Sequence, residues 1–366
     1  MNLRIPGPTP CPPEVLAAVA REMVDHRGPE FAAALRRVSQ GLKDAFHTSN
    51  DVLIFTASGT GGLEVAIVNT LSPGDPVLAV SIGNFGDRFA SIARTYGADV
   101  TKLSFAPGQA ADPAAIDEAL GKNPAIKAVL VTHNETSTGV TNPLREIAEV
   151  VRRHDKLLLV DAVSSMSSIP CEVDAWGLDV VVSGSQKGWM VPPGLAFVSF
   201  SPRAWQANET AKMPRFYLDA RRARESLEKG QTPWTPAVSI VFGLEVALDM
   251  LEREGWENVY ARHARCGDVA RQGVQQLGLK LLADPRYASN TVTAVWAPEG
   301  INVSELRKLL REEYGTVLGG GQGELTGKIF RIGHLGLVSE ADVQAAVDAL
   351  AQALARLGYE RVPVTR

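Results

Sequence analysis

Short apolar runs alternate with helical stretches between residues 52 and 199, and this alternation restricts the possible folds more than any other feature of the sequence. A helix after a strand returns the chain to the sheet edge where the next strand begins, so the alternation predicts a mostly parallel sheet with helices on both faces. Helical patterns occupy, for example, 64–70 and 143–153. Seven runs have the character of strands: 52–55, 77–81, 100–105, 128–132, 157–161, 180–183 and 195–199. We therefore expect an α/β fold with a seven-stranded sheet.

The pattern changes after residue 237, where longer helices and isolated strands replace the regular alternation. The expected elements there are helices through 252 and over 259–277, 303–313 and 339–357, with strands at 291–295 and around Arg331. A chain of 366 residues is long enough for a large and a small domain. We predict an extended N-terminal segment (1–20), a large domain (21–251) and a small C-terminal α+β domain (252–366).

An amine and a carboxylate end two of the predicted strands. Lys187 lies in a loop of small residues after the apolar run 178–182, and Asp161 ends the run 157–161. Taken alone, Lys187 could be a solvated surface residue and Asp161 a helix cap. As a pair at the carboxyl edge of a parallel sheet, they supply what pyridoxal phosphate requires. The amine carries the cofactor aldehyde as a Schiff base, and the carboxylate keeps the pyridine nitrogen protonated.

A phosphate group requires hydrogen-bond donors, and residues 55–62 can supply them. This segment reads as a strand end, a turn of small residues and a helix start, where backbone N–H groups have no partner and the helix dipole is positive. Ser58, Gly59 and Thr60 are the candidate phosphate ligands. A nucleotide-binding loop is the rival interpretation, but Glu64 occupies the place of the third glycine in the dinucleotide fingerprint, and the chain has no Gly-Lys-Ser/Thr triplet.

Four motifs in a fixed order give the chain a resemblance to a known family. They are Val-Asp-Ala-Val-Ser-Ser, Ser-Gly-Ser-Gln-Lys, Thr-His-Asn-Glu-Thr-Ser-Thr-Gly and Gly-Lys-Ile-Phe-Arg-Ile-Gly-His-Leu-Gly, at 160–165, 183–187, 132–139 and 327–336. The chain resembles the class V aminotransferases of the fold type I pyridoxal phosphate enzymes, near the alanine–glyoxylate and serine–pyruvate branch. The resemblance extends from Pro6 to Gly336 and the helix after it.

The resemblance implies a role for each candidate residue. Lys187 would form the Schiff base and Asp161 would contact the ring nitrogen, while Gln186 would join Ser58, Gly59 and Thr60 at the phosphate. Phe85 would stack on the ring, where many relatives carry tryptophan, and phenylalanine offers a smaller face without an N–H group. Ser137 would lie near the ring hydroxyl, and Arg331 would bind the substrate carboxylate. His133 is expected to be structural.

The segment 230–236 contains two prolines, which favour an extended strip before the next helix. In the family such a strip reaches the other subunit and places a threonine on its cofactor phosphate. Aligning the following helix favours Thr235 over Thr232 for that role. The resemblance therefore implies a homodimer with active sites shared across the interface.

The function implied is an aminotransferase that moves the amino group of alanine or serine to glyoxylate or pyruvate in a ping-pong reaction. Lys187, once freed, would act as the base, although a lysine near its reference pKa of about 10.4 needs burial and nearby positive charge to do so. Two alternatives stay open. A lyase of the cysteine desulfurase type needs a nucleophilic cysteine on a C-terminal loop, and a non-catalytic cofactor-binding protein is expected to lack Arg331. The sequence does not determine the donor.

Composition excludes several other classes of function. The net charge of −4 does not favour nucleic-acid binding, and no apolar run reaches the ~20 residues that a membrane span needs. The three cysteines, Cys11, Cys171 and Cys266, lie far apart and fit a reducing compartment better than a disulfide framework. Neither they nor the histidines have the spacing of metal ligands. We expect a cytoplasmic protein without a metal site.

Overall fold

The computed structural model describes residues 1–360, and its largest element is a seven-stranded sheet with the order β2-β10-β9-β8-β5-β3-β4. The last six residues of the predicted small domain, 361–366, lie outside the described part. All seven expected strands are present, namely β2 (Val52–Thr56), β3 (Pro76–Ser81), β4 (Asp99–Ser104), β5 (Ala128–Thr132), β8 (Leu157–Asp161), β9 (Val180–Gly184) and β10 (Leu195–Phe200). Only β10 runs antiparallel to its neighbours, so the expected mostly parallel sheet is confirmed.

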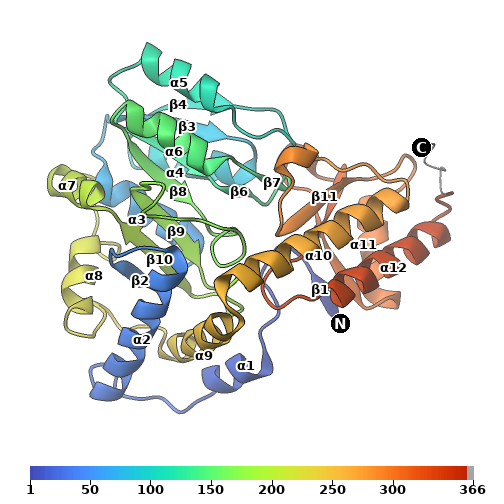
Figure 1. Ribbon diagram of the computed structural model, residues 1–366, viewed down its shortest axis with the longest axis horizontal. Coiled ribbons are helices and arrows are strands. Elements are labelled where there is room, and N and C mark those ends of the chain that lie inside the picture. Colours follow the sequence, from blue (N-terminus) through green and yellow to red (C-terminus); the bar gives the residue numbers. More distant parts are fainter. Residues whose placement is uncertain (361–366) are drawn as a thin grey trace.

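Helices cover both faces of this sheet, as Figure 1 shows. Consecutive strand residues point to opposite faces, so Leu159 and Val182 join one apolar cluster while Val160 and Val181 join the other. Burial on both sides explains why the strands read as continuous apolar runs. The helices of this part are α2 (Pro29–Phe46), α3 (Gly59–Thr70), α4 (Asn84–Thr95), α5 (Pro113–Lys122), α6 (Leu144–Arg153), α7 (Pro202–Thr210), α8 (Ala220–Leu227) and α9 (Val238–Glu254).

A second sheet, with the order β1-β12-β13-β11, forms the smaller part of the molecule at the right of Figure 1. Its strands are β1 (Asn2–Arg4), β11 (Val292–Trp296), β12 (Thr316–Gly320) and β13 (Ile329–Gly333), and its helices are α10 (Trp256–Gln276), α11 (Val303–Glu313) and α12 (Glu340–Arg356). Phe330 and Ile332 of β13 pack with Leu350 of α12 in a separate apolar cluster. The smaller α+β unit therefore has a core of its own.

The N-terminal segment differs from the extended form that the sequence predicts. Residues 2–4 form β1, which pairs in parallel with β12 of the smaller sheet. Residues 13–19 form helix α1 (Pro13–Val19), whose first residue is a proline. Proline fits the first helical position because the N–H group that it lacks would have no helical partner there. The segment between β1 and α1 lies against the lysine loop, since Thr9 N donates to Gln186 O.

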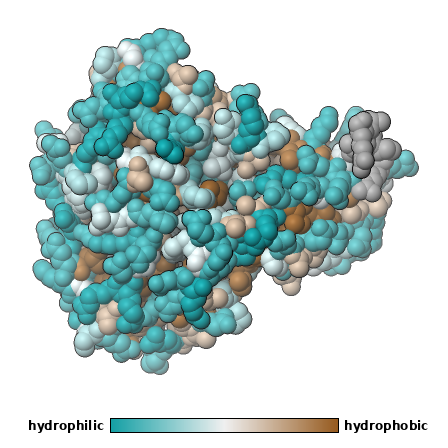
Figure 2. Space-filling model, viewed as in Figure 1, coloured by the Kyte–Doolittle hydropathy of each residue, from teal (hydrophilic) through white to brown (hydrophobic). Residues whose placement is uncertain are grey.

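The face of the molecule in Figure 2 is mostly hydrophilic, with hydrophobic residues in small separate groups. Among residues 1–360, no helix is both long enough and apolar enough to cross a bilayer.

Candidate active site

Lys187 is a buried amine at the carboxyl edge of the large sheet. It follows β9, and 9% of its surface is exposed. Its Nζ donates to the carbonyl oxygen of Pro6 at 2.6 Å, so the N-terminal segment covers it. Gly7 has a φ of +134°, which side chains rarely adopt, and a Cβ atom there would lie 2.6 Å from Nζ, so a side chain at this crossing would be strained and would displace the amine. Burial, together with the charges of Arg331 and Arg88, lowers the pKa of Lys187 to about 8. The structure therefore provides the depressed basicity that a catalytic lysine needs.

Asp161 ends β8, the neighbour of β9. One of its oxygens, Oδ1, accepts from Val163 N at 3.0 Å, and Oδ2 has no hydrogen-bond partner among residues 1–360. Burial raises the pKa of Asp161 to about 6, and the positive charge of Lys187 opposes the shift. A buried acceptor of this kind gains most from a cationic partner, because that partner would restore the stability of its charged form.

The start of α3 provides the expected anion site. Its N-cap residue, Ser58, makes no side-chain capping bond, and the N–H groups of the first helical turn have no intrahelical partner. A Cβ atom on Gly59 would lie 2.6 Å from Val163 Cγ2, so the helix start packs directly against the segment after Asp161. Gln186 lies beside this turn, because a Cβ atom on Gly184 would be 3.1 Å from Gln186 Oε1 and 3.3 Å from Gly59 N. Its side chain forms no hydrogen bond within residues 1–360, so its NH2 group can donate to an anion, whereas its Oε1 can only accept. Free donors and an unpaired side chain thus gather at one place, as a bound phosphate group requires.

Phe85 lies in the first turn of α4, and Arg88 follows it one turn later. The guanidinium of Arg88 lies over the Phe85 ring, 4.7 Å from its centre, and Nη1 donates to Thr60 Oγ1 at 3.2 Å. Arg88 therefore connects the predicted ring-stacking residue with the predicted phosphate loop. Sequence reasoning missed this arginine, although its i, i+3 spacing from Phe85 places both on one helix face.

The turn 136–139, which joins the short strands β6 (Asn134–Glu135) and β7 (Val140–Thr141), brings Ser137 close to α4, but the hydroxyl of Ser137 already forms hydrogen bonds. Ser137 Oγ donates to Glu135 Oε1 at 2.5 Å and accepts from Asn84 N at 3.0 Å. Its expected position near the ring hydroxyl stays a prediction. The adjacent Thr136 hydroxyl donates to Ser164 Oγ at 2.8 Å.

His133 is fully buried, and burial alone lowers its pKa to about 4. Its ring stands edge-on to Trp176, with a centre distance of 6.2 Å. It is therefore neutral at physiological pH. This geometry agrees with the structural role that the sequence suggested.

Arg331 is buried in β13 and forms no ion pair with the acidic residues of the described chain. Its Nε donates to Gly320 O at 2.8 Å and its Nη1 to Thr136 O at 2.9 Å and Gln322 Oε1 at 3.3 Å. No protein partner is present for Nη2 among residues 1–360. A guanidinium fixed by backbone carbonyls, with donors to spare and no acidic partner, is suited to an anionic ligand. The alternative of a surface salt bridge does not fit this geometry.

The strip at 230–236 is partly exposed and belongs to no helix or strand, but the chain bends at 233–234, so the structure does not bear out a fully extended form. The Thr232 hydroxyl donates to Trp234 O at 2.7 Å, whereas Thr235 is exposed and forms no hydrogen bond with residues 1–360 through its hydroxyl. The strip lies beside the end of β2, since Ala237 N donates to Thr56 Oγ1 at 3.2 Å. Thr235 is thus available to another molecule.

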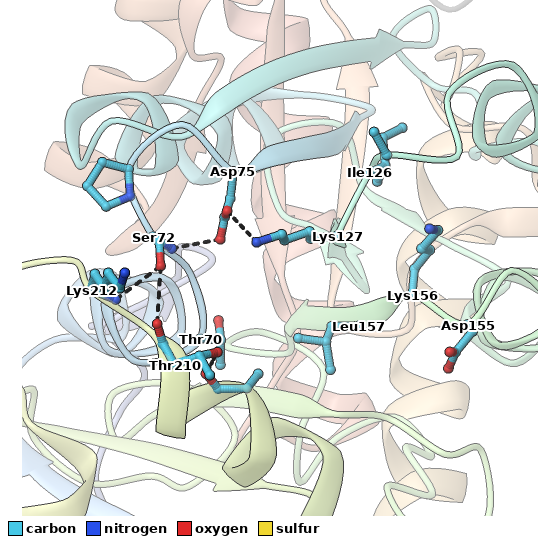
Figure 3. A pocket seen from close by; sticks show the side chains of 13 residues that line it. Thr70, Ser72, Asp75, Ile126, Lys127, Asp155, Lys156, Leu157, Thr210 and Lys212 are labelled. Carbon is cyan, nitrogen blue, oxygen red and sulfur yellow. Dashed lines mark hydrogen bonds and ion pairs between the residues drawn. The ribbon is translucent and has the colours of Figure 1, made fainter.

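A hollow of about 730 Å³ lies at the other edge of the large sheet. Figure 3 shows Asp75, Lys127 and Lys156 around it, which precede β3, β5 and β8. Lys127 Nζ is paired with Asp75 Oδ1 at 2.6 Å. Ligands of open α/β sheets bind at the carboxyl ends of the strands, where Lys187 and Asp161 lie. The hollow is therefore not our candidate for the catalytic site.

The residues at the carboxyl edge fit pyridoxal phosphate. The buried Lys187 amine suits its aldehyde, the free oxygen of Asp161 suits its ring nitrogen, and the uncapped start of α3 beside Gln186 suits its phosphate. No group of three or more histidine, cysteine or acidic residues within 1–360 has the arrangement of a metal site.

Comparisons with known proteins place the chain among aminotransferases. The family model described as aminotransferase class-V matches residues 3–352. The "Soluble hydrogenase, small subunit" of Synechococcus sp. is 45% identical over 98% of this chain and 94% of that protein. The L-aspartate–glyoxylate aminotransferase of Paracoccus denitrificans is 40% identical over 97% of this chain and 91% of that protein. The solved structure of alanine–glyoxylate aminotransferase from Nostoc sp. has a TM-score of 0.93 and 32% identity, with 96% of this chain and 94% of that chain covered.

Proposed function

The chain belongs to the class V aminotransferase family, whose members depend on pyridoxal phosphate, and we propose that Lys187 and Asp161 are its catalytic centre. The protein is an aminotransferase that transfers amino groups between amino acids and oxo acids. The observation that carries the proposal is the pairing of a buried amine with a buried carboxylate at the ends of adjacent strands. Within residues 1–360, the amine forms a hydrogen bond only to the Pro6 carbonyl oxygen, and one oxygen of the carboxylate forms no hydrogen bond.

When bound, pyridoxal phosphate supplies an aldehyde for the amino group and a ring that accepts electrons. Lys187, Asp161, Gln186, Phe85 and the start of α3 at Ser58, Gly59 and Thr60 would hold it. The freed Nζ of Lys187 would take the Cα proton of the donor and deliver it to the carbon of the former aldehyde, because returning it to Cα would only restore the amino acid. A pKa lowered to about 8 leaves a useful fraction of this amine neutral near physiological pH.

Arg331 would bind the carboxylate that amino acids and oxo acids share. Its Nη2 has no partner within residues 1–360, and one hydrogen of Nη1 becomes free when the long bond to Gln322 opens, while the other stays on Thr136 O. The two nitrogens can then hold one carboxylate through parallel bonds. Because this clamp recognises the part that all these substrates have in common, it does not select the side chain.

We propose alanine or serine as the donor and glyoxylate or pyruvate as the acceptor. Among the relatives, one is named for aspartate and glyoxylate and a solved neighbour for alanine and glyoxylate, which agrees with a small acceptor. A desulfurase of the cysteine type is not favoured, because Cys266 is fully buried in α10 and burial raises the pKa of its thiol to about 11. The name of the Synechococcus relative refers to a hydrogenase, but no residue arrangement within 1–360 favours that activity here.

A homodimer with shared active sites is the proposed assembly. Phe216 is 64% exposed and stacks on Trp234 of the strip with ring centres 4.9 Å apart. Exposed aromatic groups of this size are typical of protein interfaces. An interface here would bring the free Thr235 hydroxyl to the phosphate site of the partner. The cytoplasmic location expected from the sequence stays a prediction.

A single-turnover experiment tests the reaction. Holoenzyme is mixed with one amino acid at a time and no acceptor, and the oxo acid formed is counted against active sites. We expect one equivalent from the true donor and further turnover only when an oxo acid is added. Release of sulfide from cysteine would favour the lyase instead, and the absence of any oxo acid from a panel that includes alanine, serine and aspartate would refute the proposed donors.

Mixed dimers test the shared site. Lys187→Ala removes the amine of one chain, and Thr235→Asp places a negative charge where the strip would meet a phosphate. If each site combines Lys187 of one chain with Thr235 of the other, a dimer of the two variants has one intact site. Activity should therefore appear when the two inactive variants are expressed together. Failure to recover any activity in isolated mixed dimers would contradict the sharing.

A further inference from the structure

Glu135 is a carboxylate without solvent contact that holds four hydrogen-bond donors. Its exposed fraction is 0%, and it forms no ion pair with a residue of the described chain. Oε2 accepts from Phe85 N at 3.0 Å and from Gly86 N at 3.1 Å. Oε1 accepts from Ser137 N at 3.0 Å and from Ser137 Oγ at 2.5 Å. Oε2 therefore binds the start of α4, and Oε1 binds the 135–137 segment.

One of these segments is the first turn of α4, which carries the ring-stacking candidate Phe85. Backbone N–H groups in the first turn of a helix have no partner within the helix, and a negative charge there also interacts favourably with the helix dipole. Glu135 supplies both the acceptor and the charge. Asn84 N donates to Ser137 Oγ, so three successive N–H groups of this turn are held by the 135–137 segment.

The start of α4 and the 135–137 segment lie in direct contact. Because the Glu135 carboxylate is bonded to both, it fixes their relative position. A Cβ atom on Gly83 would lie 2.5 Å from Ser137 Oγ and 2.7 Å from Glu135 Cδ. The other segment also carries Thr136, whose carbonyl oxygen accepts from Arg331 Nη1 at 2.9 Å. Glu135 is thus bonded to both segments that place the ring-stacking and carboxylate-binding side chains.

We propose that Glu135 is a positioning residue for this aminotransferase, which fixes Phe85 for stacking on the cofactor ring by holding the first turn of α4. The inference rests on the proposed cofactor site. Glu135 does not contact substrate or cofactor, because its side chain is enclosed by the groups that it binds. Its effect is on the geometry of Phe85 and not on proton transfer.

The variant Glu135→Gln tests this idea with little change in shape. A carboxylate offers two acceptor oxygens, whereas a carboxamide offers one oxygen and one NH2 group. If the NH2 group faces α4, it meets the N–H donors of Phe85 and Gly86. If it faces Ser137, it meets the Ser137 N–H, while the Ser137 hydroxyl can turn to accept from it. In both orientations at least one buried backbone N–H loses its acceptor, so the contact between the two segments is weakened. We expect the dissociation constant for pyridoxal phosphate to rise at least about tenfold, since a lost bond leaves buried donors unpaired. The induced circular dichroism of the bound cofactor should also fall, because it reports how firmly the ring is fixed.

Asp87→Asn is the matched control. It makes the same chemical change in the same helix, but Asp87 binds Ser81 and Lys102 instead of the N–H groups at Phe85. Its cofactor affinity and dichroism should match those of the unsubstituted protein. Thermal unfolding of each apoprotein separates a general loss of stability from a change at the ring.

A double-mutant cycle with Phe85→Ala, measured as cofactor affinity, distinguishes an effect through Phe85 from a general loss of stability. If Glu135 acts through Phe85, then Glu135→Gln weakens cofactor binding much less when residue 85 is already alanine. An equal effect in both backgrounds, or unchanged affinity and dichroism in the single variant, would overturn the inference. Failure of the unsubstituted protein to bind the cofactor would instead refute the proposed function.

Should Glu135→Gln not fold, hydrogen exchange in the unsubstituted holoenzyme replaces it. The amides of Phe85 and Gly86 should exchange as slowly as those in the middle of α4, although no helical carbonyl protects them. Exchange as fast as at Glu257 and Asn258, which are exposed in the first turn of α10 where no side chain caps the helix, would show that the carboxylate does not hold the turn and would overturn the inference.

Discussion

Replacing Arg331 should impair the reaction of every substrate that carries a carboxylate, because its guanidinium is buried in β13 and forms no ion pair with the acidic side chains of residues 1–360. Each hydrogen bond to a charged group contributes about 1.5–3 kcal/mol, so losing two of them costs about 3–6 kcal/mol. Arg331→Gln removes the charge as well as the fork of donors. We expect kcat/KM for the amino acid and for the oxo acid to fall by at least about a hundredfold, since each 1.4 kcal/mol is a factor of ten.

The substitution also has a structural cost that must be separated from the loss of binding. Arg331 donates to the carbonyl oxygens of Gly320 and Thr136, and removing these bonds destabilises the segments that they join. Arg307→Gln is the matched control, because it also removes an arginine that donates to a backbone carbonyl of the smaller sheet. Arg307 of α11 donates through Nε to Leu318 O of β12 at 2.9 Å. It should lower thermal stability without a comparable loss of kcat/KM.

The assay is the rate of the first half-reaction for alanine and for ethylamine, which differs from alanine in lacking the carboxylate. Arg331→Gln should slow the reaction of alanine strongly and the reaction of ethylamine little. Equal loss for both compounds would mean that Arg331 acts through the fold. A loss for alanine below about fivefold, which corresponds to about 1 kcal/mol, would refute the assignment of the clamp.

Three further predictions concern the buried carboxylate of Asp161, the tight contact at Gly59 and the exposed aromatic patch at Phe216. Burial in the folded apoprotein raises the pKa of Asp161 from 3.8 to about 6, so the free energy of unfolding should fall as the pH rises through that interval. At pH 7, Asp161→Asn should therefore stabilise the apoprotein by about 2–3 kcal/mol in urea unfolding, although it should weaken cofactor binding. An apoprotein destabilised by this substitution would contradict the prediction. Gly59→Ala should lower the free energy of unfolding by about 1–3 kcal/mol and reduce cofactor affinity, because its Cβ atom would collide with Val163. Gly121→Ala is the control, since a Cβ atom there has open space, and it should change neither urea unfolding nor cofactor titration. Equal effects of the two substitutions would refute the packing argument. Phe216→Arg should shift sedimentation toward the monomer if the aromatic patch is the interface, and an unchanged sedimentation coefficient would remove the patch from it.

The large sheet could be predicted from the sequence because its strands are buried on both faces. That burial requires continuous apolar runs such as 157–161 and 180–183, and the end of each run indicates where a functional residue leaves the sheet. Asp161 and Lys187 were found in this way, and the pairing of β8 with β9 confirms that they leave adjacent strands.

The features that the sequence did not reveal depend on contacts between distant segments. Strand β1 pairs with β12, more than 300 residues away, and nothing in the three residues of β1 indicates that partner. The role of Pro6 as a cover for Lys187 depends on the same crossing of the N-terminal segment. Glu135 looks like a turn residue in the sequence, and only its bonds to Phe85 and Gly86 distinguish it.

The central claim is that Lys187 Nζ carries the cofactor covalently. Borohydride reduction of the holoprotein, followed by proteolysis and mass spectrometry, should find a phosphopyridoxyl group on the peptide that contains Lys187, and Lys187→Ala should yield no labelled peptide. Attachment at another lysine, or no attachment in a protein that has bound the cofactor, would contradict the account.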